Sequence, residues 1–252
     1  MNTVISLLIL FANNTLNEDS YYSVAKYILE NLSQMENISA NTLAKNCHTS
    51  ITTVNNFCHK LGFESYKKLK TMLINTKNGR LEQIKYRYLQ FDQDKILKQV
   101  ERLYQKEIDI DSFEKNIDKI VTLIHDTDKI YCFGAVFPLA LLVNFVEDML
   151  IFNKVINLQQ ISYKNEYSDF DQDSLLIFIT ITGRFLTMNK QMFLTLNNNM
   201  AKKVIISQKT FFDHFDVLLK LNGNEDDEVE NLIILEIFNL IKYKYFMKYI
   251  NK

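Results

Sequence analysis

The segment from Ser39 to Lys70 most constrains the fold, because its apolar residues recur at helical spacing and two breaks interrupt them. This spacing predicts three short helices, whose buried sides carry Leu43, Ala44, Val54, Phe57, Cys58, Leu61, Tyr66 and Leu69. Ser39 and Ser50 can cap the first two helices, and Gly62 stands where a left-handed residue ends the second. The polar turn His48-Thr49-Ser50 therefore predicts a helix-turn-helix, whose second helix enters the major groove of DNA.

The second predicted helix and the residues after it carry a dense, ordered motif made of Ser50, Thr53, Val54, Phe57, Cys58, Lys60, Leu61, Gly62, Phe63, Tyr66, Leu69 and Lys70. This motif resembles the signature of the RpiR/MurR family of bacterial transcriptional regulators. The resemblance implies an N-terminal helix-turn-helix joined to a C-terminal sugar-isomerase (SIS) domain that senses a phosphosugar. One position departs from the family pattern, because many members carry Arg immediately before the Phe-Cys pair, where this chain has Asn56.

The outward side of the second helix supplies the candidate DNA contacts. The capping residue and the polar positions of this helix are Ser50, Thr52, Thr53, Asn55, Asn56, His59 and Lys60. Thr52, Thr53 and Asn56 are expected to reach base edges, since they lie near the start of a recognition helix. Asn pairs with adenine and Thr contacts a thymine methyl group, so an A·T-rich operator is the hypothesis. The phosphate contacts are assigned to Lys45, Lys60, Lys67, Lys68 and Lys70.

The charge of the chain is unevenly distributed. Residues 41–80 contain seven Lys and Arg side chains and one acid, Glu64, which gives this segment a net charge of +6. The whole chain has a net charge of −1, so the remainder carries −7. A basic module attached to an acidic body is what binding to a phosphate backbone requires. A lysine-rich, solvated helix surface would produce the same step.

Cysteine, histidine and hydropathy patterns exclude several classes of protein. Cys47, Cys58 and Cys132 show neither disulfide nor metal spacing, and the four histidines are scattered. The apolar run from Ile5 to Phe11 is too short to span a bilayer, and no basic region precedes it. We therefore expect a cytoplasmic protein with no metal, no cofactor and no membrane partner.

The second half of the chain alternates helical and strand patterns after Asp111. Apolar runs predict strands at Lys129–Phe133, Val155–Leu158, Leu175–Ile181, Lys203–Ser207 and Asp216–Leu221. Helices are expected between them, including Leu139–Phe152, Leu186–Leu196 and a long one from Glu228 to Ile250. Such alternation predicts a doubly wound parallel sheet covered on both faces.

The predicted fold class is therefore an all-α helix-turn-helix domain followed by an α/β doubly wound, SIS-like domain. The expected domains are residues 1–78, a helical linker at residues 79–108, and an effector-sensing and dimerisation domain at residues 109–252. A helix break is expected at Asn78-Gly79.

Two loops at the carboxyl ends of predicted strands are the candidate ligand site, because doubly wound sheets bind ligands at that edge. The first is Gly134-Ala135-Val136-Phe137-Pro138, and the second is Thr180-Ile181-Thr182-Gly183-Arg184. SIS domains place their ligand loops at these points, so the resemblance implies ligand contacts from Gly134, Thr180, Thr182, Gly183 and Arg184. Compared with the SIS pattern, Val136 replaces a glycine, Pro138 a serine and Phe185 a threonine. Each lost hydrogen bond weakens a phosphosugar site by about 1 kcal/mol or more.

Three alternatives stay open for this half: it binds a phosphorylated sugar, it binds another small effector, or it binds nothing and serves as a dimerisation body. No catalytic residue is expected, because only Glu147 and Asp148 lie near the two loops in sequence, inside a helix where surface or pairing roles are expected.

The predicted function is a DNA-binding transcriptional regulator of carbohydrate-metabolism genes, modulated by a phosphosugar. Its partners would be a double-stranded DNA operator, a phosphorylated sugar effector, and a second copy of the chain in a homodimer or higher homo-oligomer. The alternative is a SIS-like protein that binds or isomerises a sugar phosphate, with N-terminal helices that only mediate assembly.

Overall fold

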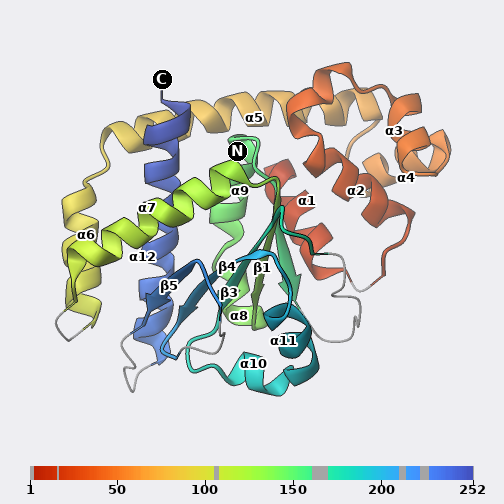
Figure 1. Cartoon of the computed structure of the whole chain (residues 1–252). Coiled ribbons are helices and arrows are strands. Elements are labelled where there is room, and N and C mark those ends of the chain that lie inside the picture. The colour runs from red at the N-terminus through yellow and green to blue at the C-terminus, as the bar shows by residue number, and fades with distance from the viewer. Residues whose placement is uncertain are drawn as a thin grey trace. The chain divides into compact units, whose positions relative to one another are not determined.

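The computed structural model describes residues 3–15, 17–104, 108–160, 170–209, 214–221 and 227–251 (Figure 1). The chain divides into two compact units. The first combines Met1–Leu89 with Glu147–Val155, and the second combines Gln90–Val146 with Ile156–Lys252.

The first unit is helical in its N-terminal part. Its elements are α1 (Thr3–Asn14), α2 (Ser20–Glu30), a 3-10 helix (Leu32–Asn37), α3 (Ala40–Asn46), α4 (Ile51–Lys60) and α5 (Tyr66–Leu89) (Figure 1). The three helices expected between Ser39 and Lys70 are therefore confirmed.

Local hydrogen bonds fix the helix-turn-helix. The Ser39 Oγ accepts the backbone N–H of Thr42 at 3.1 Å, and the Ser50 Oγ accepts that of Thr53 at 3.1 Å, so both expected caps form. In the turn between α3 and α4, His48 takes a φ of 50°. After α4, Gly62 takes a φ of 84°, a conformation that glycine adopts without strain. The buried side of α4 consists of Val54, Phe57 and Cys58, as predicted, whereas Leu61, also expected there, is half-buried at the end of the helix.

Helix α5 runs without interruption through Asn78-Gly79, so the break expected there is wrong. Its buried residues continue at spacings of three and four on both sides of the glycine: Leu69, Leu73, Thr76, Arg80, Ile84 and Tyr88. Packing along this stripe outweighs the cost of about 1 kcal/mol that glycine imposes inside a helix. The domain boundaries at residues 78 and 108 stay a prediction.

A buried ion cluster joins α5 to the end of α9 (Val143–Ile151) inside the first unit. Arg80 donates from Nε and Nη2 to the Asp148 Oδ1, at 3.0 and 2.8 Å, and Arg87 donates from Nη1 to the Asp148 Oδ2 at 3.2 Å. Asp148 is fully buried, and Arg80 is 8% exposed. Glu147 lies 4.0 Å from Arg80 and accepts a hydrogen bond from the Ser6 hydroxyl. Burial raises the pKa of Glu147, although Arg80 and Ser6 act in the opposite direction.

The second unit contains a five-stranded sheet made of β1 (Lys129–Gly134), β2 (Ile156–Gln160), β3 (Ser174–Ile179), β4 (Lys202–Ser207) and β5 (Val217–Lys220). The strands follow the order β2-β1-β3-β4-β5, and every neighbouring pair is parallel. All five predicted strands are present, and the predicted fold class is confirmed.

Both faces of this sheet are covered. On one face, Phe133, Leu176, Phe178 and Ile205 form a buried cluster with residues of α10 (Arg184–Met188) and α11 (Lys190–Asn197). The alternate positions of the same strands, such as Cys132, Ile177 and Val204, are also fully buried. Successive side chains of a strand point to opposite faces, so a second layer covers the other face.

The remaining helices of the second unit are α6 (Gln93–Tyr104), α7 (Ile110–Asp126), α8 (Val136–Ala140), α12 (Asp227–Tyr245) and a π-helix (Phe246–Ile250), and α9 begins in this unit (Figure 1). Helix α12 packs against α6 and α7, and α7 packs against β5. Two expected single helices are wrong in extent. The segment Leu139–Phe152 is divided between α8 and α9, and Leu186–Leu196 is divided between α10 and α11.

We predict that Arg80→Ala lowers the free energy of unfolding by about 3–5 kcal/mol, because it removes one partner of a buried carboxylate. The double substitution Arg80→Met with Asp148→Leu should lower the free energy of unfolding by less than Arg80→Ala does, because it removes both members of the buried pair and leaves no Asp148 carboxylate without its partner. Urea denaturation monitored by circular dichroism measures the free energy of unfolding of both variants.

The matched control is Lys85→Ala, which breaks the exposed pair of Lys85 and Glu82 on the same helix, 2.8 Å apart. A pair of this kind contributes less than about 0.5 kcal/mol. Equal losses for Arg80→Ala and Lys85→Ala would contradict the structural importance of the buried cluster.

Candidate functional site

Helix α4 presents one polar face to solvent. Thr52, Asn56, His59 and Lys60 are exposed, whereas Thr53 and Asn55 are half-buried. Neither Thr52 nor Asn56 forms a side-chain hydrogen bond within the described part of the chain. Their polar groups therefore remain available to a partner, as base readout requires.

Ser50 and Thr53, unlike the other predicted DNA contacts, form hydrogen bonds within α4. Their hydroxyl oxygens lie 2.9 Å apart, and the Ser50 Oγ also accepts the Thr53 N–H. Both hydroxyls thus belong to the cap of α4, where they satisfy a backbone donor that the helix itself leaves unpaired.

The five predicted phosphate contacts fall into two groups. Lys45, Lys67 and Lys68 are exposed side chains. Lys60 places its ammonium 4.7 Å from the ring centroid of Tyr21, and Lys70 donates to the backbone oxygens of Glu36 and Ile38 at 2.7 and 3.1 Å. Lys70 therefore also completes the hydrogen bonding at the end of the 3-10 helix.

The two loops expected to hold a ligand meet at the carboxyl edge of the sheet. They line an open cleft of about 300 Å³ that is bounded by Ala135, Phe137, Pro138, Ile179, Thr180, Ile181, Thr182, Arg184, Phe185 and Asn231. Thr180, Thr182 and Arg184, which were predicted from the sequence, are among these lining residues. Gly134 and Gly183 lie next to lining residues without lining the cleft themselves.

The backbone explains why glycine occupies each of these two positions. A Cβ at Gly134 would lie 2.9 Å from the Ile179 carbonyl oxygen on the paired strand β3, closer than real Cβ atoms approach. Gly183 takes a φ of 82° immediately before α10. Both positions therefore shape the loops, whatever the cleft holds.

The polar groups of the cleft are one guanidinium and a few neutral donors and acceptors. Arg184 and Thr182 are exposed, and the Thr182 Oγ1 accepts the Arg184 N–H at 3.5 Å. Thr180 is buried, and its N–H donates to the Ile206 carbonyl on β4 at 3.1 Å. None of the described lining residues is Asp, Glu or His.

Asn231 is the lining residue that sequence reasoning missed. It lies on α12, whose pattern indicated only an amphipathic helix, and about fifty positions separate it from the second loop. No local motif marks an amide that the fold brings to the cleft.

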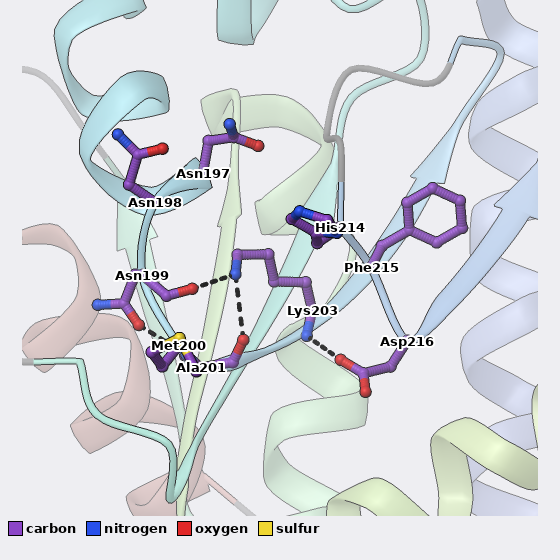
Figure 2. A pocket seen from close by; sticks show the side chains of 9 residues that line it. All are labelled: Asn197, Asn198, Asn199, Met200, Ala201, Lys203, His214, Phe215 and Asp216. Atoms are coloured by element: carbon purple, nitrogen blue, oxygen red, sulfur yellow. Dashed lines mark hydrogen bonds between the residues drawn. The ribbon is translucent and has the colours of Figure 1, made fainter.

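A second cavity, of about 590 Å³, lies at the opposite edge of the sheet, where β4 and β5 begin. Figure 2 shows the Lys203 ammonium directed at the backbone oxygens of Asn199 and Ala201, while the Lys203 N–H donates to the Asp216 carboxylate at 2.8 Å. Burial lowers the pKa of Lys203, and the charge of Asp216 opposes that shift. This lysine binds the carbonyls that follow α11, a structural role.

No helix within the described ranges is both long and apolar enough to cross a membrane. In the same residues, no three His, Cys, Asp or Glu side chains are grouped so that they could hold a metal ion.

The caps, the turn and the buried side of α4 define the N-terminal region as a helix-turn-helix domain. Residues 9–78 match the family model described as the helix-turn-helix domain of the rpiR family, so the N-terminal region is a domain of that family.

Two solved structures are similar to the chain. The NanR protein of Vibrio vulnificus, complexed with ManNAc-6P, is 17% identical over 96% of this chain and 92% of its own, with a TM-score of 0.45. The hypothetical protein MJ1247 of Methanococcus jannaschii, whose inferred function is that of a 3-hexulose-6-phosphate isomerase, is 15% identical over 63% of this chain and 91% of its own, also with a TM-score of 0.45. Neither likeness is close enough to carry an inference about this chain. No curated protein sequence matches it.

We predict opposite effects for alanine at two glycines. Gly134→Ala should lower the free energy of unfolding by about 1–3 kcal/mol, because its Cβ meets the backbone of β3. Gly79→Ala, inside α5 with no atom within 4 Å of its Cβ, should raise it by about 0.5–1 kcal/mol. Urea denaturation measures the free energy of unfolding of both variants. A change of the same sign in both would contradict the backbone roles assigned to these glycines.

Proposed function

We propose that the protein is a transcriptional regulator that binds an operator through α4 and controls genes of carbohydrate metabolism. The observation that carries the proposal is the outward face of α4, where Thr52 and Asn56 are exposed and uncommitted on a helix fixed by its cap. A recognition helix needs this combination of rigid placement and unpaired polar groups. The proposed compartment is the cytoplasm, where such an operator would lie.

Electrostatics support the same role. The net charge of +6 between residues 41 and 80 falls on the helix-turn-helix and the first part of α5. Arg80 is buried and paired with Asp148, so a net charge of +5 remains for a partner. Lys45, Lys67 and Lys68 are exposed there, so they are the proposed phosphate contacts together with Lys60 and Lys70. Phosphate neutralisation of this kind supplies most of the sequence-independent affinity for DNA.

The proposed protein partner is a second copy of the chain. Helix-turn-helix proteins commonly read two half-sites about one helical turn apart, which requires two recognition helices. Helix α1 is apolar and exposes Leu7 and Leu10, side chains that a contact between copies would bury.

The proposed effector is a phosphorylated sugar in the cleft at the carboxyl edge of the sheet. Arg184 can pair with a phosphate, the hydroxyls of Thr180 and Thr182 add neutral hydrogen-bonding groups, and Gly134 and Gly183 shape the two loops. The volume of about 300 Å³ is at the lower end for small-molecule sites. We ascribe no reaction to the cleft, since isomerisation needs a positioned base and the described lining residues include neither carboxylate nor imidazole.

A second candidate is that the α/β domain binds no ligand and serves in dimerisation. The first loop favours it, because Val136 and Phe137 are 63% and 61% exposed and Phe185 lines the cleft. Val136 and Phe185 stand where the SIS pattern has a glycine and a threonine.

Binding to duplex DNA of random sequence tests the regulator. We expect affinity to fall steeply as salt rises, and Lys67→Ala or Lys68→Ala to reduce the slope of log K against log salt by about one each. Lys98→Ala, an exposed lysine on α6 in the other unit, is the control and should leave the slope unchanged. A wild-type protein without salt-dependent binding would refute the proposed function.

A thermal-shift screen against sugar phosphates tests the effector. We expect at least one of them to raise the melting temperature, and Arg184→Ala to weaken that ligand about ten- to a hundredfold by removing a charge-assisted hydrogen bond. Lys190→Ala, exposed on α11 and outside the cleft, should bind normally. No shift with any sugar phosphate in folded protein would favour the ligand-free candidate.

A further inference from the structure

The first residue of α4 is an exposed branched aliphatic side chain. Ile51 follows the cap residue Ser50 directly and is 46% exposed. Isolated apolar residues on a protein surface are ordinary, so exposure alone says little. The position of Ile51 on α4 is what gives it meaning.

Ile51 lies on the outward face of α4. Residues 51, 52, 55, 56 and 59 share one side at helical spacing, whereas Val54, Phe57 and Cys58 form the buried side. The other strongly exposed apolar side chains described in the first unit lie on α1 and α5, among them Leu7, Leu10, Met72 and Leu89. Ile51 is therefore the exposed aliphatic group at the tip that a recognition helix inserts first.

The cap chemistry reinforces this assignment. Ser50 and Thr53 commit their hydroxyls to each other and to the helix, so they are poorly placed to read bases. At the beginning of α4 this leaves Ile51 and Thr52 facing outward. The side chain of Ile51 has no donor or acceptor, and the apolar feature of a base edge in the major groove is the C5-methyl group of thymine.

We propose that Ile51 determines operator specificity by packing against a thymine methyl group in the major groove. This inference rests on the proposed function and adds a residue and a base to it. Asn56 and Thr52 then supply the hydrogen-bonding part of the readout, and Ile51 supplies the apolar part.

The test replaces thymine by deoxyuridine, which removes the methyl group and leaves base pairing intact. Operator sequences are first selected from random duplexes with the wild-type protein, and each thymine of the selected site is then replaced singly. At one position in each half-site, we expect deoxyuridine to weaken wild-type binding about three- to fivefold, the effect of exposing one methyl group. Ile51→Ala should bind the thymine operator correspondingly more weakly and be insensitive to deoxyuridine at that position.

Leu89→Ala is the matched control, since Leu89 is 82% exposed at the end of α5 and should retain the full thymine preference. Circular dichroism melting of Ile51→Ala establishes that the variant is folded. The inference would be overturned if wild type and Ile51→Ala were equally sensitive to deoxyuridine, or if neither had a sensitive position. The proposed function would still stand in that case, provided that the wild type binds DNA with the expected salt dependence. Absence of salt-dependent duplex binding by the wild type would overturn both.

Discussion

A carboxylate buried away from water sets the strongest constraint on the first unit. Asp148 is held by Arg80 and Arg87, two residues that lie about two turns apart on α5. Its charge is tolerable only while these guanidinium groups are beside it. Helix α9 supplies Asp148, yet it begins in the second unit and ends in the first. The geometry of α5 is thus linked to a helix that follows the first loop of the cleft.

Local signals predicted much of the fold, and the errors lie where distant residues decide. The caps at Ser39 and Ser50 and the apolar strands depend on neighbouring residues, so the sequence alone located them. Gly79 indicated a break because glycine disfavours helix, but packing on both sides of it keeps α5 continuous. The partners of Asp148 and the place of Asn231 in the cleft could not be predicted, since tens of residues separate each from its neighbours in space.

The cleft shows why a sequence motif is a weak guide to ligand binding. Gly134 stands where the SIS pattern has a glycine, and the pattern suggests a role beside a ligand. The close approach of the Ile179 carbonyl gives the same glycine a purely structural role. The same glycine would be needed in a domain that binds no ligand, whereas Phe137 and Phe185, which line the cleft, bear more directly on what the cleft accepts.

The crossing of α9 between the two units has a practical consequence for dissecting the protein. A cut at residue 78, where the sequence suggested a boundary, would divide α5 and leave both arginines with Asp148, whereas a cut after α5 at Leu89 would separate Asp148 from Arg80 and Arg87. A fragment beginning near residue 109 would contain Glu147 and Asp148 but none of the α5 residues that neutralise them. The helix-turn-helix region and the α/β domain are therefore not interchangeable modules, because Asp148, which lies in the sequence of the α/β half, contributes to the stability of the first unit.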